Sequence, residues 1–262
     1  MTRIEKKFRE LRRKNKKAFI VFITCGFPNL ATTHRLILEL EKCGVDIIEL
    51  GVPFSDPLAD GPIIQAASER SLKRGTTLGD VIKLVKKIRQ ISQIPLAIMS
   101  YYNPILSMGE ERFIRQVSRS GLDGLIIPDL PPEEAADLIG YCREFKINTI
   151  FFLSPTSSKE RIKLIDRASS GFIYYVSLTG VTGIRSKLHK ELGNRVRLLK
   201  RFTTKPICVG FGVSNRNQVR ELSGFADGVI VGSAIVKKIQ DNLGKKDLVD
   251  RVGRFVRNLK GT

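Results

Sequence analysis

Two carboxylates eleven residues apart are the first side chains in this sequence that could carry acid–base chemistry. Glu49 interrupts the end of Val45–Leu50, an apolar run with the composition of a buried strand. A carboxyl group taken out of water has a raised pKa and can exchange a proton near neutral pH. A buried ion pair with a basic neighbour, or a rim position facing water, would explain Glu49 without catalysis.

The second carboxylate, Asp60, stands in the segment Ser55–Pro62. Two prolines and one glycine exclude a helix there and predict a loop that leads into a helix from Ile63. An aspartate before a glycine is also an ordinary turn pair. Turn formation alone is therefore the alternative explanation for this residue.

Two glycine-containing segments near the end of the chain predict a phosphate site. Gly210–Gly212 follows one apolar run, and Gly232 with Ser233 follows the next. Glycine lets the backbone approach an anion closely, and Ser233 could cap a short helix whose free N–H groups face that anion. Barrels often bind phosphate at these two places, while two turns that only close the barrel are the alternative.

The segment Ser177–Gly183 has the small, hydroxylated composition of a mobile lid. The two histidines, His34 and His189, lie in helical patterns without a partner at ligand spacing. The sequence therefore predicts no metal site, and no Ser/His/Asp set can be assembled from it.

The elements that must position these groups are eight apolar runs that alternate with amphipathic segments. The runs are apolar throughout, as parallel strands covered on both faces are. They are Phe19–Thr24, Val45–Leu50, Pro95–Tyr101, Gly124–Ile127, Thr149–Leu153, Phe172–Val176, Ile207–Val209 and Gly228–Val231. Amphipathic helices are expected at Thr32–Cys43, Leu78–Ile91, Glu133–Phe145, Lys159–Ala168, Leu188–Phe202, Asn215–Leu222 and Lys246–Leu259.

The alternation of apolar runs and amphipathic segments over 262 residues predicts a single α/β domain of the (β/α)₈ barrel type, residues 1–262. The competitor is a doubly wound open sheet, although no GxGxxG follows the first run. In a barrel, the functional groups gather at the C-terminal ends of the strands.

Composition limits the setting of the protein. A hydrophobic fraction of 42% is enough for a core, and the longest apolar run, Ala18–Thr24, is too short to span a bilayer. No apolar stretch of a signal peptide follows the basic start, and four scattered cysteines contain no CxxC pair. These features predict a cytoplasmic protein with no membrane association.

The charge balance is strongly basic, with 45 Lys and Arg against 26 Asp and Glu, a net charge of +19. Nine of the basic residues lie in Arg3–Lys17. Ile4, Phe8 and Leu11 recur there at helical spacing, which predicts an amphipathic surface helix with one buried face. Polyanions would be attracted to such a surface, but no nucleic-acid-binding motif accompanies it, so nucleic acid is disfavoured as a partner.

The segment Ile48–Pro62 resembles the signature of the tryptophan synthase alpha chain family. The resemblance runs in order through essentially the whole chain. It continues in Ser100–Pro104, Pro128–Pro131, Tyr174–Gly183, Gly210–Ser214 and Gly232–Val236. It implies a (β/α)₈ TIM barrel with an extra N-terminal helix and a short phosphate-binding helix after the eighth strand.

The family resemblance also implies an activity, a carbon–carbon lyase reaction. The expected reaction is the retro-aldol cleavage of indole-3-glycerol phosphate to indole and glyceraldehyde 3-phosphate. It implies Glu49 and Asp60 as the catalytic pair, with neither a metal nor a cofactor in this chain. A catalytically silent barrel that only activates its partner is the alternative.

Further site residues follow from the resemblance by position. Phe22, Tyr101, Asp129, Tyr174 and Phe211 match the substrate pocket. Gly183, Gly212, Gly232 and Ser233 match the phosphate cradle, and Thr182 matches a lid hydroxyl that meets Asp60 on closure. Leu178 departs from the family, whose members commonly carry an arginine early in the lid.

The partner implied by the resemblance is a tryptophan synthase beta chain. It would contain pyridoxal phosphate, form an alpha2-beta2 tetramer with this chain and convert the released indole to L-tryptophan. Asp56, Asn103 and Pro131 match alpha residues that face this partner.

Overall fold

The strands of this protein are all parallel and belong to one sheet. The computed structural model describes residues 1–176, 185–210 and 212–261, and of residues 185–190 it describes the backbone only. The strands are β1 (Ala18–Thr24), β2 (Ile47–Gly51), β3 (Leu96–Met99), β4 (Gly124–Ile126), β5 (Asn148–Ile150), β6 (Phe152–Leu153), β7 (Ile173–Val176), β8 (Ile207–Gly210) and β9 (Gly228–Val231).

The strand order shows that this sheet closes into a barrel. It runs β5-β4-β3-β2-β1-β9-β8-β7-β6, so its two ends are β5 and β6. These two strands are separated in the chain by Phe151 alone and are the halves of one predicted strand. β5 pairs with β4 and β6 pairs with β7, which joins the ends of the sheet. The (β/α)₈ prediction is confirmed, and the open-sheet alternative is wrong.

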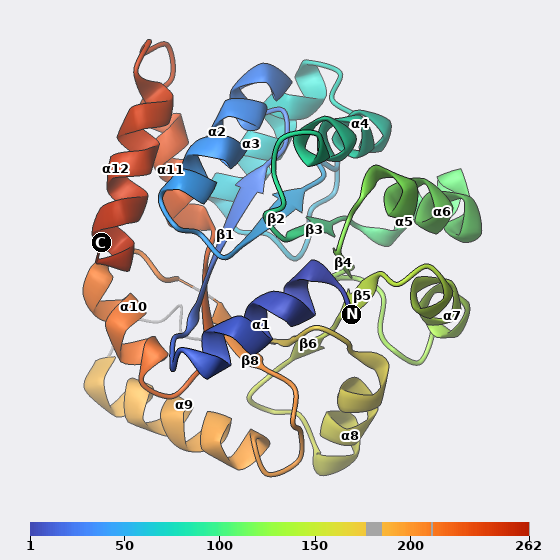
Figure 1. Cartoon of the computed structure of the whole chain (residues 1–262), viewed down its shortest axis with the longest axis vertical. Helices are drawn as coiled ribbons and strands as arrows, with labels where there is room; N and C mark the ends of the chain where they lie inside the picture. Colours follow the sequence, from blue (N-terminus) through green and yellow to red (C-terminus); the bar gives the residue numbers. More distant parts are fainter. Residues whose placement is uncertain (177–184, 211, 262) are drawn as a thin grey trace.

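Helices surround the strands on the outside, except for α1, which lies at one mouth of the barrel (Figure 1). They are α1 (Arg3–Arg13), α2 (Leu30–Lys42), α3 (Pro62–Lys73), α4 (Leu78–Arg89), α5 (Tyr102–Met108), α6 (Glu110–Ser120), α7 (Ala136–Glu144), α8 (Lys159–Ala168), α9 (Arg185–Leu199), α10 (Arg216–Ser223), α11 (Ser233–Gln240) and α12 (Leu248–Lys260). Among the described residues, no helix has the length and apolar character needed to cross a membrane.

Some helix boundaries differ from the sequence expectation. α7 begins three residues later than predicted, because the two residues after Pro132 form a turn closed by N–H groups of Glu134 and Ala135. α5 lies in a segment for which no helix was predicted. Pro104 is tolerated there because it falls in the first turn, where its missing N–H has no helical acceptor.

Helix α1 lies across one mouth of the barrel (Figure 1). Its buried side chains Ile4, Phe8 and Leu11 pack against inward-facing residues of the strands, which confirms the predicted amphipathic helix. Gly124 of β4 leaves the room for this contact, because a Cβ atom there would lie 2.8 Å from Cδ1 of Ile4. The helix therefore closes the N-terminal end of the strands, opposite the end where a barrel binds its substrate.

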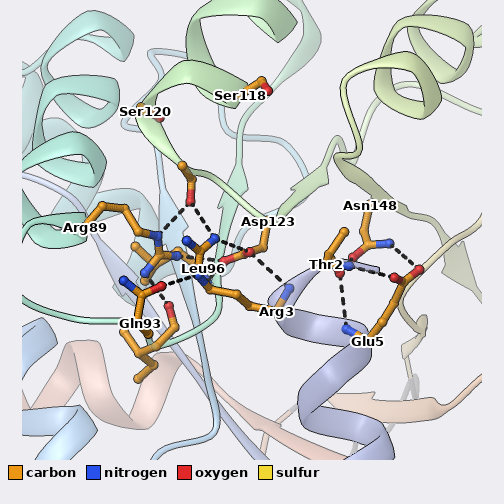
Figure 2. Close-up of polar contacts among 12 residues, drawn as sticks. Thr2, Arg3, Glu5, Arg89, Gln93, Leu96, Ser118, Ser120, Asp123 and Asn148 are labelled. Atoms are coloured by element: carbon orange, nitrogen blue, oxygen red, sulfur yellow. Dashed lines mark hydrogen bonds and ion pairs between the residues drawn. The ribbon is translucent and has the colours of Figure 1, made fainter.

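A buried ion network holds the start of α1 to the barrel (Figure 2). The carboxylate of Asp123, 2% exposed, accepts hydrogen bonds from Arg89 at 2.7 Å, from Arg3 at 3.0 Å and from the N–H of Leu96 at 3.0 Å. Both oxygens of Asp123 are thus satisfied by groups from three different elements of the chain.

The pairing of β1 with β2 determines how deep in the barrel Glu49 lies. Phe22 of β1 is paired with Glu49 of β2. Two residues earlier, Ile20 and Ile47 belong to the interior cluster under α1. Because residues i and i+2 of a strand share a face, Phe22 and Glu49 also point into the barrel, one layer closer to the C-terminal ends of the strands.

Candidate active site

A cavity of about 530 Å³ lies at the C-terminal ends of the strands. Six residues of the predicted site line it, and they come from loops and strands spread over the chain: Phe22, Asp60, Tyr174, Gly212, Gly232 and Ser233. Its volume is in the range of small-molecule sites. The structure therefore brings most of the described candidate residues together around one space.

Glu49 is a buried carboxyl group without a partner. It is 0% exposed, and neither carboxylate oxygen has a hydrogen-bond partner among the described residues. Burial raises its pKa to about 8, so the group carries its proton at neutral pH. Of the two structural alternatives, the rim position is excluded by this burial, and the ion pair is absent from the described part of the chain.

Tyr174 lines the cavity, whereas Glu49 is not among the lining residues. The tyrosine side chain lines the cavity and points inward from β7, as Glu49 does from β2. Burial raises the pKa of Tyr174, and the charge of Glu49 adds to this effect. Gly210 of the neighbouring strand leaves space for this ring, because a Cβ atom there would lie 2.8 Å from the tyrosine hydroxyl.

Asp60 is half-buried and hydrogen-bonded to a tyrosine. The hydroxyl of Tyr101 donates to Oδ2 of Asp60 at 3.1 Å and accepts the N–H of Ala59 at 2.9 Å. Burial raises the pKa of Asp60 to about 6, and the hydrogen bond from Tyr101 lowers it. At neutral pH Asp60 is therefore mostly ionised, while Glu49 is mostly protonated. The backbone of Asp60 also forms the turn that its sequence predicts, with its N–H 3.0 Å from the carbonyl of Pro57.

Tyr101 is also held through its ring. Its ring stacks on Phe54, with centroids 5.1 Å apart and planes 23° apart.

Asp129, expected at the pocket, is exposed and accepts the backbone N–H of Tyr102 at 2.9 Å. In this structure Asp129 thus anchors the start of α5 and is not among the residues that line the cavity.

The end of β9 presents backbone N–H groups to the cavity. Gly232 occupies the N-cap position of α11 and provides no side chain to cap it. The first N–H groups of this helix are therefore available to an anion, as the sequence predicts. The prediction that Ser233 caps the helix is wrong, because α11 begins at Ser233, and the N-cap position belongs to Gly232.

Four residues named from the resemblance cannot be placed. Thr182, Gly183 and Phe211 lie outside the described residues, as do Leu178 and the rest of the predicted lid. No group of three or more His, Cys, Asp and Glu side chains in the described ranges could hold a metal ion.

Comparison with known proteins decides the family. The family model described as the tryptophan synthase alpha chain matches residues 8–262 of this chain. The chain belongs to the tryptophan synthase alpha chain family. Members are the lyase subunits of tryptophan synthase, which cleave indole-3-glycerol phosphate, and the chain is such an alpha subunit.

Individual relatives agree with this family over nearly the whole chain. The tryptophan synthase alpha chain of Geotalea uraniireducens is 48% identical over 260 residues, which are 99% of this chain and 97% of the relative. That of Geobacter sp. strain M21 is 46% identical with the same coverage. Among solved structures, the alpha subunit from Legionella pneumophila matches with a TM-score of 0.93 at 36% identity, covering 99% of this chain and 97% of the other. The Pyrococcus furiosus tryptophan synthase complex matches with a TM-score of 0.85 at 37% identity, covering 94% and 98%.

Several cavity residues of this alpha chain were not predicted from its sequence. Met99, Pro128, Phe152 and Ile230 also line the space, with Ile63 and Ile64 of α3. Phe152 lies against Tyr174, with ring centroids 4.8 Å apart. Their positions near the ends of predicted strands could have indicated them. An apolar side chain that lines a cavity is, however, of the same kind as one in the core, so the sequence does not separate the two.

The residues that match the partner-facing positions of the family lie in three segments after β2, β3 and β4. Asp56 and Asn103 are exposed, and Pro131 is half-buried. Leu58, two residues after Asp56, is 92% exposed, the largest value among the exposed large hydrophobic residues of the described chain.

Proposed function

We propose that this alpha chain performs its retro-aldol cleavage with Glu49 as the general acid and base and Asp60 as the charge-stabilising carboxylate. The observation that carries this proposal is the contrast between the two groups. One is buried, unpaired and protonated at neutral pH, and the other faces the cavity and is ionised. Two carboxylates whose environments separate their pKa values are suited to different acid–base roles at one pH.

The reaction begins with a proton transfer. Protonation of indole C3 by Glu49 turns the ring into an indolenium, a good leaving group for the bond between C3 and the glycerol chain. The positive charge spreads to the ring N–H, which donates to the carboxylate of Asp60 and is stabilised by it. The carboxylate of Glu49 then takes the proton of the glycerol hydroxyl beside the scissile bond. As that bond breaks, its electron pair returns to the indole ring, and the hydroxyl becomes the aldehyde of glyceraldehyde 3-phosphate.

The remaining residues would bind and orient the substrate. Phe22 and Tyr174 provide apolar surface for the indole ring, and Tyr101 holds Asp60. Gly212, Gly232 and Ser233 stand where the free N–H groups of α11 can receive the phosphate. The family resemblance adds Gly183 to this cradle, Phe211 and Asp129 to the pocket, and the Thr182 hydroxyl as a contact of Asp60 when the lid closes.

A beta chain is the proposed partner, in an alpha2-beta2 tetramer located in the cytoplasm. It would hold the pyridoxal phosphate, while both proton transfers proposed for this chain use its own carboxylates. The surface formed by Asp56, Asn103 and Pro131 would face the beta chain. Leu58, which is 92% exposed, lies in the same loop as Asp56 and would also face the beta chain. The four free cysteines, all buried, agree with a reducing compartment.

The test is the release of indole from indole-3-glycerol phosphate, followed with the chain alone and with a beta chain. We expect turnover in both cases and a higher rate in the complex. Absence of indole in both assays would favour a silent subunit that only activates its partner. Leu58→Asp should leave the rate of the isolated chain unchanged and weaken its activation by the beta chain.

A further inference from the structure

A second cavity, of about 560 Å³, lies between the start of α2, the end of α3 and the start of α12. It is formed by the loop between β1 and α2, the first turns of α2, the end of α3 and the loop between α11 and α12. It shares no lining residue with the cavity that contains Asp60. We infer that this second cavity binds a small molecule that carries two or more linked phosphate groups.

The charge of the lining carries the inference. Five of the twelve residues that line the cavity are Lys or Arg, against 45 of 262 in the whole chain, and none of the twelve is acidic. The five are Arg35, Arg70, Lys73, Arg74 and Lys245. Cations brought together around one space repel one another, and a multiply charged anion in that space removes the repulsion.

The partners of these side chains show which charges are available. Lys73 forms an exposed ion pair with Glu69 at 2.6 Å, which neutralises it in part. Arg35 donates to the hydroxyl of Thr32 at 3.3 Å, and Lys245 donates to the side-chain oxygen of Asn242 at 3.2 Å. Both of these acceptors are neutral, so the two positive charges are not compensated by them.

Arg70 and Arg74 are the most available of the five. In the described ranges of the chain, neither guanidinium makes a hydrogen bond or an ion pair, and the charge that acts on them is the Glu69 carboxylate, which pairs with Lys73 and attracts Arg70 at longer range. They lie four residues apart near the end of α3, and side chains with this spacing lie on one face of a helix. A guanidinium fork matches the oxygens of a phosphate in pairs, so two such forks suit a diphosphate better than a single charge.

The size of the cavity narrows the range of ligands that would fit it. A volume of about 560 Å³ is in the range of sites for nucleotide-sized molecules and exceeds what one inorganic phosphate would fill. The apolar residues Leu243 and Leu248 form part of the wall and could contact a non-phosphate portion. We therefore expect the ligand to contain a diphosphate or triphosphate group, either as the free inorganic anion or as part of a nucleotide.

The experiment is calorimetric titration of the full chain with pyrophosphate at low salt, first without glycerol 3-phosphate and then with it saturating the active-site cradle. The test variant is Arg70→Gln with Arg74→Gln. The control is Arg112→Gln with Arg119→Gln, which removes the same charge from exposed positions of α6. We expect one pyrophosphate site, a loss of affinity of about tenfold or more in the test variant, and wild-type affinity in the control.

Other outcomes would overturn the inference. These are no binding to the wild-type chain up to about 10 mM pyrophosphate, equal loss of affinity in both variants, or loss of binding when glycerol 3-phosphate is present. Titration with ATP and with inorganic triphosphate distinguishes the two ligand sources. Tighter binding of ATP assigns the site to a nucleotide, and equal binding assigns it to the phosphate chain alone.

Discussion

The hydroxyl of Tyr101 bridges Asp60 and the backbone beside it. It donates to Oδ2 of Asp60 at 3.1 Å and accepts the N–H of Ala59 at 2.9 Å. This hydrogen bond stabilises the ionised carboxylate and works against burial, which raises the pKa of Asp60 to about 6. The tyrosine thus links the position of the loop to the charge state of the proposed catalytic residue.

Tyr101→Phe should move the acidic limb of the pH–rate profile to higher pH. The variant lacks the bond that favours the charged form, so the pKa of Asp60 rises and less carboxylate is ionised at a given pH. At pH 6 we expect a loss of turnover of roughly three- to tenfold, and a smaller loss at pH 8. Tyr102→Phe is the matched control, because its hydroxyl donates to Glu110 instead. An unchanged acidic limb in Tyr101→Phe would show that the bond does not tune Asp60.

Glu49→Gln should lower turnover by at least ~100-fold, because the amide cannot supply the proton to indole C3. Substrate binding should be retained, since the amide keeps the size of the side chain. Turnover is measured at saturating indole-3-glycerol phosphate, and binding by titration of the variant. Glu144→Gln, on the exposed surface of α7, serves as the control. A variant at position 49 with most of its turnover would assign the proton to another group.

Glu49→Gln should also make the folded chain more stable than wild type at alkaline pH. The pKa of Glu49 is about 8 in the folded chain, against 4.5 for a free glutamate, so between these values the folded state holds a proton that the unfolded state releases. The free energy of unfolding therefore falls as pH rises through this window. Gln has no proton to lose, and we expect the variant to be more stable than wild type at pH 8 by at least about 1 kcal/mol. Urea unfolding at pH 5 and pH 8 measures the difference, and parallel pH dependence in both proteins would contradict it.

Asp123→Ala should destabilise the chain by about 3–5 kcal/mol. The change leaves the guanidinium of Arg89, whose side chain is 8% exposed, without its countercharge and removes an acceptor of Arg3. Asp241→Ala is the control, because it breaks an ion pair with Lys237 in which the side chains are 52% and 50% exposed. That pair should contribute less than about 1 kcal/mol. Equal losses in the two variants, measured by urea unfolding, would contradict a structural role for the network in Figure 2.

Gly210→Ala should weaken substrate binding by displacing Tyr174. The added Cβ would lie 2.8 Å from the hydroxyl of Tyr174, 2.9 Å from Cε1 of the same ring and 3.0 Å from Cβ of Ile230. We expect a loss of stability of about 1–3 kcal/mol together with a raised KM. Tyr174→Leu in the same chain removes both contacting ring atoms and should restore part of the lost stability. Additive effects of the two changes on stability would show that the tyrosine ring is not the obstacle.

The sequence alone determined those features that depend on local pattern. The eight apolar runs predicted the barrel, since a strand covered on both faces must be apolar throughout wherever its neighbours lie. The helical spacing of Ile4, Phe8 and Leu11 predicted the buried face of α1 for the same reason. Glu49 was noticeable because a charged residue inside an apolar strand conflicts with its surroundings before any contact is known.

The tertiary structure decided which groups meet and which stay alone. That Glu49 has no partner in the described chain, while Asp60 has Tyr101, depends on where segments about forty residues apart in the chain come together. The basic cavity joins three segments that are unremarkable in a chain with a charge of +19. Ser233 has a good capping side chain, yet Gly232 takes the N-cap position, because the path of β9 into α11 fixes where the helix starts. Local pattern encodes burial and periodicity, whereas pKa values, ion pairs and cavities arise from distances between segments that only the closed barrel sets.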